Sequence, residues 1–182
     1  MVNAEHASQP VRQDVLVVDR PEQLKALGHP LRLRVLEMLG TEEGEGLTNR
    51  ELAQRLDVDP GHLHFHVRML LRAGLIQLSE TSGGREKPYR SVARTIRVAP
   101  ELIASGEGSD LRAAMLKEVE LGWQAHAAAG RFRIAQVTAR LSEEQALHLI
   151  TELVERARDL EDPEAEPLVL TTIFHPPTAQ DG

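Results

Sequence analysis

Residues 48–76 read TNRELAQRLDVDPGHLHFHVRMLLRAGLI and contain two short helix patterns separated by a tight break. Thr48, followed three residues later by Glu51, forms the capping-box signature of a helix start. Residues 57–60 end that helix, and Asp59 is placed to cap the next one. The second helix is expected to end at Gly74, since glycine readily takes the left-handed conformation of a helix C-terminus. The stretch therefore predicts two helices joined by a sharp turn.

The second of these helices has one apolar face and one positively charged face. Leu63, Val67 and Leu70 recur at helical spacing and are expected to point inward. The opposite face then carries Gly61, Phe65, Arg68 and Arg72, with His62 and His64 on its flanks. A helix of this kind can enter the major groove of DNA, where an arginine can bind guanine and an apolar ring can contact a thymine methyl group.

The segments on either side complete an ordered set of elements. Upstream, residues 15–18 are β-branched or apolar and predict a strand, and Asp19 with Glu22 predicts a capped helix start. Residues 28–30 (GHP) interrupt the apolar face that follows and predict two short helices meeting at an angle. Downstream, residues 76–80 and 89–98 predict the two strands of a hairpin, a wing, with residues 81–88 as its loop.

Further DNA contacts are expected outside the second helix. The start of the first helix, at Thr48, Asn49 and Arg50, can hold a phosphate through its free N–H groups and side chains. The hairpin has a glycine tip followed by cations that can reach the DNA backbone or minor groove. These wing residues are Gly83, Gly84, Arg85, Lys87 and Arg90.

Charge is unevenly distributed along the chain. The formal net charge is −7, but residues 61–97 contain seven Lys or Arg and only two Glu. Residues 101–182 contain seven Lys or Arg and fifteen Asp or Glu. A basic segment joined to an acidic remainder is typical of a DNA-binding module with a separate half that does not touch DNA.

Several motifs resemble those of ArsR-type winged helix-turn-helix regulators. They are LGHPLR at 27–32 with Val35 and Leu36, NRELA at 49–53, VRMLLRAGLI at 67–76 with His66 in the family's histidine position, and GREKPYR at 84–90. The resemblance covers roughly residues 20–98, and it implies a homodimer that binds a pseudo-palindromic operator. The family's metal sensors carry a Cys-x-Cys pair or a His/Asp site on the last helix, and this chain has no cysteine and no such set on the helix from Asp110.

Composition argues against several other classes of protein. The chain has 182 residues, 41% of them hydrophobic and 27% charged, as in one ordinary globular domain or two small ones. Because it has no cysteine, disulfides and thiolate chemistry are excluded. No apolar run suits a membrane span or a signal peptide, so we expect a cytoplasmic protein. No nucleophile elbow, phosphate loop or carboxylate pair is present, so we expect neither an enzyme nor a cofactor.

The run His62, His64, His66 raises the alternative of a metal site, because His62 and His66 share one helix face. A metal site needs at least a third ligand, and no partner is identifiable nearby. DNA contact or simple packing is therefore favoured, and no metal is expected.

Residues 101–182 predict a helix–strand–helix–strand half. The helices are expected at 110–129 and after Ser142, which forms a capping pair with Gln145, and the strands at 132–141 and 168–174. Two strands alone form a marginal sheet, so either the strand at 15–18 or a second copy of the chain must complete it. Dimerisation is the simpler explanation. Its expected seam is a set of apolar residues at fourfold spacing: Leu111, Met115, Val119 and Trp123.

The fold class predicted is mainly α with a small amount of β (α+β). It comprises an N-terminal arm (1–18), a winged helix-turn-helix domain (19–100) and a dimerisation region (101–182). The function predicted is sequence-specific binding of double-stranded DNA by a homodimeric transcription repressor. The alternative is a winged-helix module that binds another protein and not DNA. Whether a small-molecule effector binds residues 101–182 is left open by the sequence.

Overall fold

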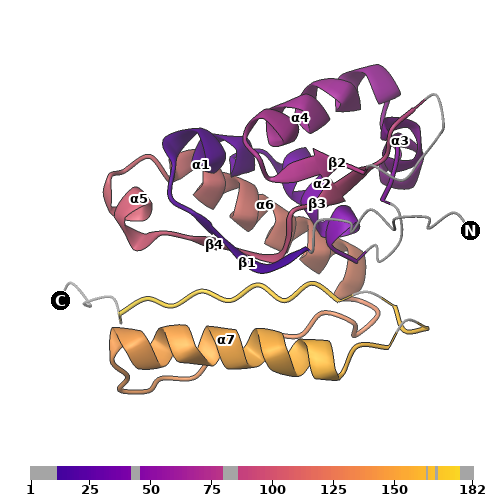
Figure 1. Cartoon of the computed structure of the whole chain (residues 1–182). Helices are drawn as coiled ribbons and strands as arrows, with labels where there is room; N and C mark the ends of the chain where they lie inside the picture. Colours follow the sequence, from indigo (N-terminus) through magenta and orange to yellow (C-terminus); the bar gives the residue numbers. More distant parts are fainter. Residues whose placement is uncertain (1–11, 42–45, 80–85, 163, 167, 177–182) are drawn as a thin grey trace, which may run out of the picture. The chain divides into compact units, whose positions relative to one another are not determined.

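The computed structural model describes residues 12–41, 46–79, 86–162, 164–166 and 168–176. Within these residues it contains seven helices and two small sheets, which confirms the predicted α+β class. The helices are α1 (Pro21–Leu27), α2 (Pro30–Thr41), α3 (Asn49–Leu56), α4 (Pro60–Arg72), α5 (Pro100–Ala104), α6 (Ser109–His126) and α7 (Glu143–Asp159) (Figure 1). The strands are β1 (Gln13–Val18), β2 (Ile76–Leu78), β3 (Tyr89–Ser91) and β4 (Ala93–Val98).

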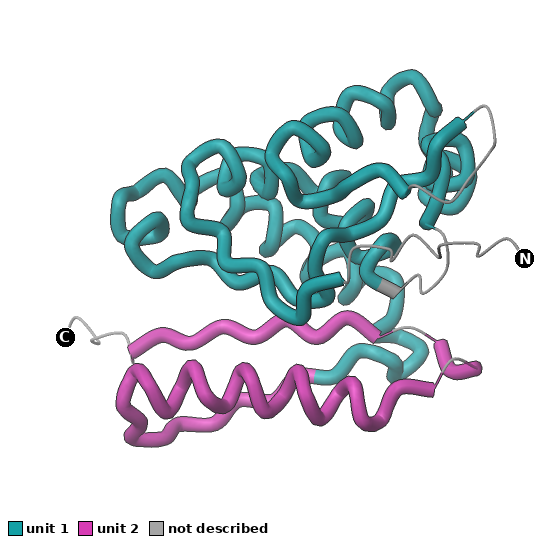
Figure 2. Tube along the Cα trace, in the orientation of Figure 1, with its two compact units in different colours: residues 1–133 teal, residues 134–182 magenta. Residues whose placement is uncertain are grey.

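The chain divides into two compact units, residues 1–133 and residues 134–182 (Figure 2). The first unit contains every element from β1 to α6, so α6 packs with the helices that precede it and contacts α1 and α2. The second unit contains α7 and the extended segments before and after it. None of the described helices is both long and apolar enough to cross a lipid bilayer.

The apolar core of the first unit is formed by aliphatic side chains from all of its early elements. Fully or almost fully buried members are Val18, Leu24, Val35, Leu39, Leu52, Leu63, Val67, Leu70, Leu75 and Ile76. Helix α6 adds Leu111 and Ala114, which are 6% and 2% exposed. Burial of this continuous cluster is what fixes the angle between α4 and the helices beneath it.

The break between α1 and α2 is confirmed, but the expected cap of α1 is wrong. Helix α1 has Arg20 at its N-cap without a side-chain cap bond, because Pro21 occupies the first helical turn and places Asp19 outside the helix. At the start of α2, the backbone N–H of Leu31 donates to Nδ1 of His29 over 3.1 Å. His29 therefore satisfies an orphan donor of the next helix.

The sheets differ from the predicted hairpin in one respect. The segment expected as one strand, residues 89–98, is two strands, because the chain changes partner at Val92: β3 pairs antiparallel with β2, and β4 pairs parallel with β1. The backbone N–H of Val92 donates instead to Leu75 O. The strand at residues 15–18 is confirmed within β1, yet it joins β4 and not the C-terminal half as one alternative had it.

Two strands predicted in the C-terminal half are absent. Residues 132–141 and 168–174 are extended but pair with no strand in the described chain. Their apolar side chains are solvent-accessible, as Val137 at 88% and Leu168 at 82% illustrate. Alternating polarity makes a segment suitable for a sheet, but a strand forms only when a neighbour satisfies its backbone groups. The capping box of α7, formed by Ser142 and Gln145, is confirmed.

Candidate nucleic-acid interface

Helices α3 and α4 are joined by a corner that the local sequence specifies. Thr48 Oγ1 accepts a hydrogen bond from the N–H of Glu51, and the Glu51 carboxylate accepts from the N–H of Thr48 at 2.8 Å, which completes the predicted capping box. Asp57 has φ of 52°, the left-handed conformation that ends α3. The Asp59 carboxylate then accepts from the N–H of His62 at 2.8 Å and starts α4. The expected turn is therefore confirmed.

Helix α4 has the two faces that its sequence pattern predicts. Leu63, Val67 and Leu70 are all 0% exposed and pack into the core. The opposite face is exposed and carries Gly61, His62, His64, Phe65, Arg68 and Arg72. Phe65 is 64% exposed, an unusual environment for an aromatic side chain in a monomer. The exposed face of α4 thus combines two arginines and two histidines with one phenylalanine.

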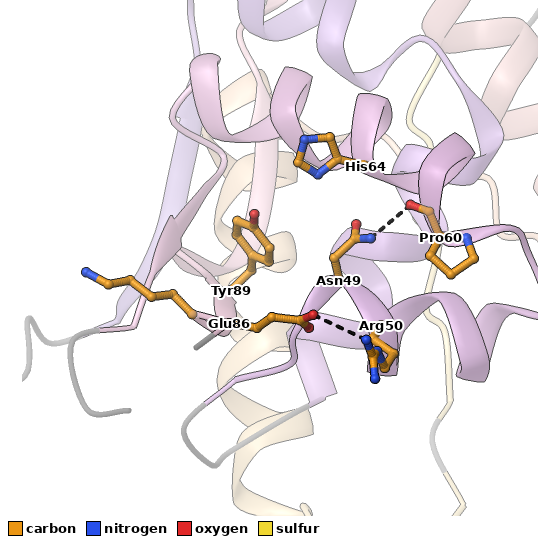
Figure 3. Close-up of a pocket in the computed structure, with 7 residues that line it drawn as sticks. Asn49, Arg50, Pro60, His64, Glu86 and Tyr89 are labelled. Carbon is orange, nitrogen blue, oxygen red and sulfur yellow. Dashed lines mark hydrogen bonds and ion pairs between the residues drawn. The ribbon is translucent and has the colours of Figure 1, made fainter. Parts of the chain in front are cut away.

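A hollow of about 400 Å³ lies between the first turns of α3 and α4 and the start of β3 (Figure 3). It is lined by Asn49, Arg50, Pro60, His64, Glu86, Lys87 and Tyr89. Asn49 Nδ2 donates to Pro60 O at 2.9 Å, which ties the two helix starts together. The Arg50 guanidinium lies 3.6 Å from the Glu86 carboxylate. The hollow therefore brings together residues far apart in the sequence, with Arg50 and Lys87 supplying positive charge at its rim.

The wing is a short hairpin anchored to the helices by a third segment. Leu47 and Tyr89 exchange two backbone hydrogen bonds, of 2.9 and 2.7 Å, beside the β2–β3 pair. Gly46, just before Leu47, has φ of 94°, and a side chain there would collide with the carbonyl group of Tyr89. Sequence reasoning missed this contact. Of the wing residues predicted to meet DNA, Gly83, Gly84 and Arg85 lie outside the described residues, whereas Lys87 is exposed.

Arg90 is placed differently from the other wing cations. It lies opposite Gln77 in the β2–β3 register, and the Gln77 amide oxygen, turned toward it, accepts from Arg90 Nε at 2.9 Å and from its second terminal nitrogen at 3.1 Å. This cross-strand pair stabilises the hairpin. Arg90 is thus held against its own hairpin in the free protein.

Residues 27–78 match the family model described as a helix-turn-helix domain. This segment is a helix-turn-helix domain. The match runs from the last residue of α1 to the last residue of β2, so it includes the whole α3–turn–α4 arrangement. A search of curated proteins found no match to the chain. A domain of this kind indicates a DNA-binding regulator.

Inside the helix-turn-helix domain, His66 lies in the core, whereas its sequence had left both DNA contact and packing open. It is 5% exposed and packs between His29 and His62, with ring centroids 4.4 and 4.9 Å from its own. Burial, followed by the nearby His29, His62 and Arg32, lowers the pKa of His66 to about 4. The spacing of residues 63, 66, 67 and 70 is that of one buried helix face, so the helical period alone could have placed it.

Arg32 is a buried cation at the junction between α1 and α2. It is 7% exposed, and its guanidinium donates to the carbonyl oxygens of Lys25 and Ala26 at the end of α1. Desolvation lowers the pKa of Arg32, and Asp110 of α6 opposes that shift. Carbonyls at a helix C-terminus favour a positive charge, so Arg32 joins α1 to α2. In the described chain no three His, Asp or Glu side chains are grouped so as to hold a metal ion.

The predicted dimer seam on α6 is partly covered within one chain. Leu111 is 6% exposed against α1 and α2, and Met115 packs partly against the same core. Val119 and Trp123, farther along, are 40% and 54% exposed, and the Trp123 ring meets Phe132 edge-on at 5.4 Å. Only the second half of the predicted seam is therefore open to another molecule, because the first half is already used to pack α6.

Proposed function

We propose that this protein is a winged helix-turn-helix transcription regulator, resembling the ArsR type, that binds double-stranded DNA sequence-specifically as a homodimeric repressor. The observation that carries the proposal is the exposed face of α4. It presents Phe65 and Arg68 to solvent on a helix whose opposite side is fully buried. A helix of this diameter fits the major groove, where the pattern of base-edge donors and acceptors differs between base pairs.

The proposed roles follow the chemistry of each exposed side chain. Arg68 donates two hydrogen bonds to guanine O6 and N7, the commonest specific contact of an arginine with DNA. Phe65 packs against a thymine methyl group, which explains an exposed aromatic ring on a soluble surface. His62 and His64 donate to base edges or phosphates, Gly61 allows the backbone to approach closely, and Arg72 reaches the flanking strand.

The hollow between α3, α4 and the wing supports a phosphate contact. Arg50 and Lys87 lie at its rim with Asn49 and Thr48 beside the first turn of α3. A DNA phosphate there would form an ion pair with Arg50. In the free protein the Arg50 guanidinium lies 3.6 Å from the Glu86 carboxylate. Such contacts carry no sequence information, but they fix the register of α4 on the duplex. The wing tip, with Gly83, Gly84 and Arg85, is proposed to follow the adjacent backbone together with Lys87 and Arg90.

Homodimerisation is proposed because a helix-turn-helix usually reads two half-sites about one helical turn of DNA apart. The exposed part of the α6 seam, Val119 and Trp123, is available for this contact. Repression follows from occupancy of a pseudo-palindromic operator, as the resemblance implies. The acidic C-terminal half stays away from DNA and is where we place any small-molecule effector.

A second candidate function is a winged-helix module that binds a protein partner. The exposed Phe65 would suit it, but a protein-binding surface has no need for the basic residues that cluster from 61 to 97. The salt dependence of binding distinguishes the two candidate functions. Binding to DNA phosphates releases counterions, so the affinity falls steeply as the salt concentration rises. Selection of bound sites from a random pool of duplexes tests the proposal. We expect one enriched palindromic motif, and the absence of enrichment together with salt-insensitive or missing duplex binding overturns it.

A further inference from the structure

His66 is a buried histidine whose two ring nitrogens have different surroundings. Its Nε2 atom lies 3.3 Å from Nε2 of His62, one turn earlier on α4. Its Nδ1 atom is buried and meets no hydrogen-bond partner in the described part of the chain. The ring is neutral at pH 7, because burial, followed by the nearby His29, His62 and Arg32, lowers its pKa to about 4. A neutral imidazole carries one N–H, so His66 has a single donor.

The surroundings of His66 select the nitrogen that carries this proton. A proton on Nδ1 would leave a buried N–H group without an acceptor, which native structures rarely tolerate. A proton on Nε2 is instead donated to His62 Nε2. The His29 ring packs on His66, but its Nδ1 accepts from the N–H of Leu31, so its own proton is on Nε2 and it offers no acceptor. His66 is therefore the donor in the pair and His62 the acceptor.

This hydrogen bond determines the state of His62, an exposed residue in the first turn of α4. Because its Nε2 accepts, the proton of a neutral His62 is on Nδ1. Within the described residues the His62 ring forms no second hydrogen bond, so this N–H is available to another molecule. The N-terminal residues of a recognition helix are those that meet base edges in helix-turn-helix proteins. His62 is therefore oriented by the core at the position where a DNA contact is expected.

We propose that His66 is a positioning residue for DNA recognition, which holds His62 in the Nδ1–H tautomer so that the exposed ring offers one donor to DNA. This inference rests on the proposed function and specifies how His62 takes part in it. The chemical partner is a hydrogen-bond acceptor, either on a base edge, such as a purine N7, or on a phosphate. Holding the ring in place before binding also lowers the entropy lost when DNA binds.

Long-range proton–nitrogen NMR spectra of the isotope-labelled full-length protein at pH 7 read the tautomer of each histidine directly. The His62 and His66 signals are assigned by their loss in His62→Gln and His66→Gln. We expect His66 in the Nε2–H form and His62 in the Nδ1–H form. His64, exposed on the same helix, is the reference and should show the tautomer mixture of a solvated ring. A His62 proton on Nε2, or a mixture equal to that of His64, overturns the proposal.

Two substitutions at His66 separate positioning from packing. His66→Leu removes the donor and keeps a buried apolar side chain, whereas His66→Gln keeps an N–H donor that can reach His62. We expect His66→Leu to bind the selected operator about fivefold more weakly than the parent protein, and His66→Gln to recover most of that loss. A role in packing alone predicts the reverse order, since leucine suits a buried site better than glutamine. Circular dichroism confirms that both variants are folded, and the tautomers of the parent protein test the proposal even if one is not.

The same two variants in a His62→Ala background test whether the effect acts through His62. The difference in affinity between His66→Leu and His66→Gln should vanish there, because no ring is left to position. A difference that persists, or operator affinity unchanged in His62→Ala alone, overturns the proposal. A loss on the operator alone indicates a base-edge acceptor, whereas an equal loss on random duplexes indicates a phosphate. Failure of the parent protein to bind any duplex overturns the proposed function as well, whereas a wrong tautomer in a protein that binds DNA overturns this inference only.

Discussion

The imidazole rings of His62 and His66 face each other across one turn of α4, with their Nε2 atoms 3.3 Å apart. His62 is exposed, whereas His66 is buried against His29 at the start of α2. A hydrogen bond at this separation requires one Nε2 to donate and the other to accept, so at least one of the two rings is neutral. The pair therefore links the exposed surface of α4 to the packing beneath it.

Acidification is expected to destabilise the protein through His66. The pKa of His66 is lowered from 6.5 to about 4, first because burial removes water from the charged ring and then because His29 lies beside it. Between these two pH values the His66 ring is protonated in the unfolded chain but stays neutral in the native protein. The contribution of neutral His66 is thus fully present above pH 6.5, is lost progressively as pH falls from 6.5, and is gone below about pH 4.

Urea denaturation at pH 7 and pH 5 measures this effect. In His66→Gln the fall in the free energy of unfolding between the two pH values should shrink by about 1–2 kcal/mol relative to the parent protein. His64→Gln is the control, because His64 is exposed on the same helix. If both variants keep the parental pH dependence, His66 is not the group responsible.

Removing the cap of α4 is expected to destabilise the helix-turn-helix domain. Asp59 accepts the N–H of His62, so Asp59→Ala should lower the free energy of unfolding by about 1 kcal/mol. Asp19→Ala, at an exposed carboxylate that caps no helix, should change it by less than about 0.5 kcal/mol. Equal losses in the two variants would show that the hydrogen bond has no role in stability.

Local signals accounted for most of the helix-turn-helix domain, because each is contained within a few residues. The capping box at Thr48 and the left-handed Gly74 needed no tertiary information, and neither did the capping box at Ser142 outside this domain. The parallel pairing of β1 with β4 was not predictable, since the two strands are about eighty residues apart and nothing in either sequence specifies the other. The strands expected at 132–141 and 168–174 failed for the same reason, as their polarity pattern could not supply a neighbour.

In the candidate site, too, features local to one element were predictable, whereas contacts between elements were not. The exposed positions of Phe65 and Arg68 followed from the helical period of α4, whereas the Arg50–Glu86 contact joins residues in separate elements and was not anticipated. The Asp19 cap was wrong because two plausible start signals, Asp19 and Pro21, overlap there, and the proline fixed the helix start. Roles in DNA binding stay predictions for all of these residues.

Phe65 and Leu63 are two positions apart on α4 and are expected to respond oppositely to truncation. Leu63 is 0% exposed, so Leu63→Ala should cost about 2–5 kcal/mol in stability. Phe65 is 64% exposed, so Phe65→Ala should change stability by less than about 0.5 kcal/mol. It should nonetheless weaken binding to the selected operator about fivefold, as measured by fluorescence anisotropy. Unchanged operator affinity in Phe65→Ala would remove this ring from the interface.

Lys87 at the rim of the hollow is expected to act on all DNA sequences alike. Lys87→Ala should weaken operator and random duplexes by a similar factor, and it should reduce the slope of log affinity against log salt by about 1. Lys117→Ala on α6, an exposed lysine outside residues 27–78, makes the same change in charge and should leave the slope unaltered. A slope that falls equally in both variants would indicate a diffuse charge effect and no contact at Lys87.

Affinity of Arg68→Ala for the selected operator and for random duplex DNA is the most direct test of base readout by α4. Arg112→Ala serves as the control, because Arg112 is an exposed arginine on α6. The prediction is a loss of about 1–3 kcal/mol on the operator in Arg68→Ala, a much smaller loss on random DNA, and parental affinity in Arg112→Ala. Equal losses on operator and random DNA, or no binding of the parent protein to any duplex at low salt, would contradict it.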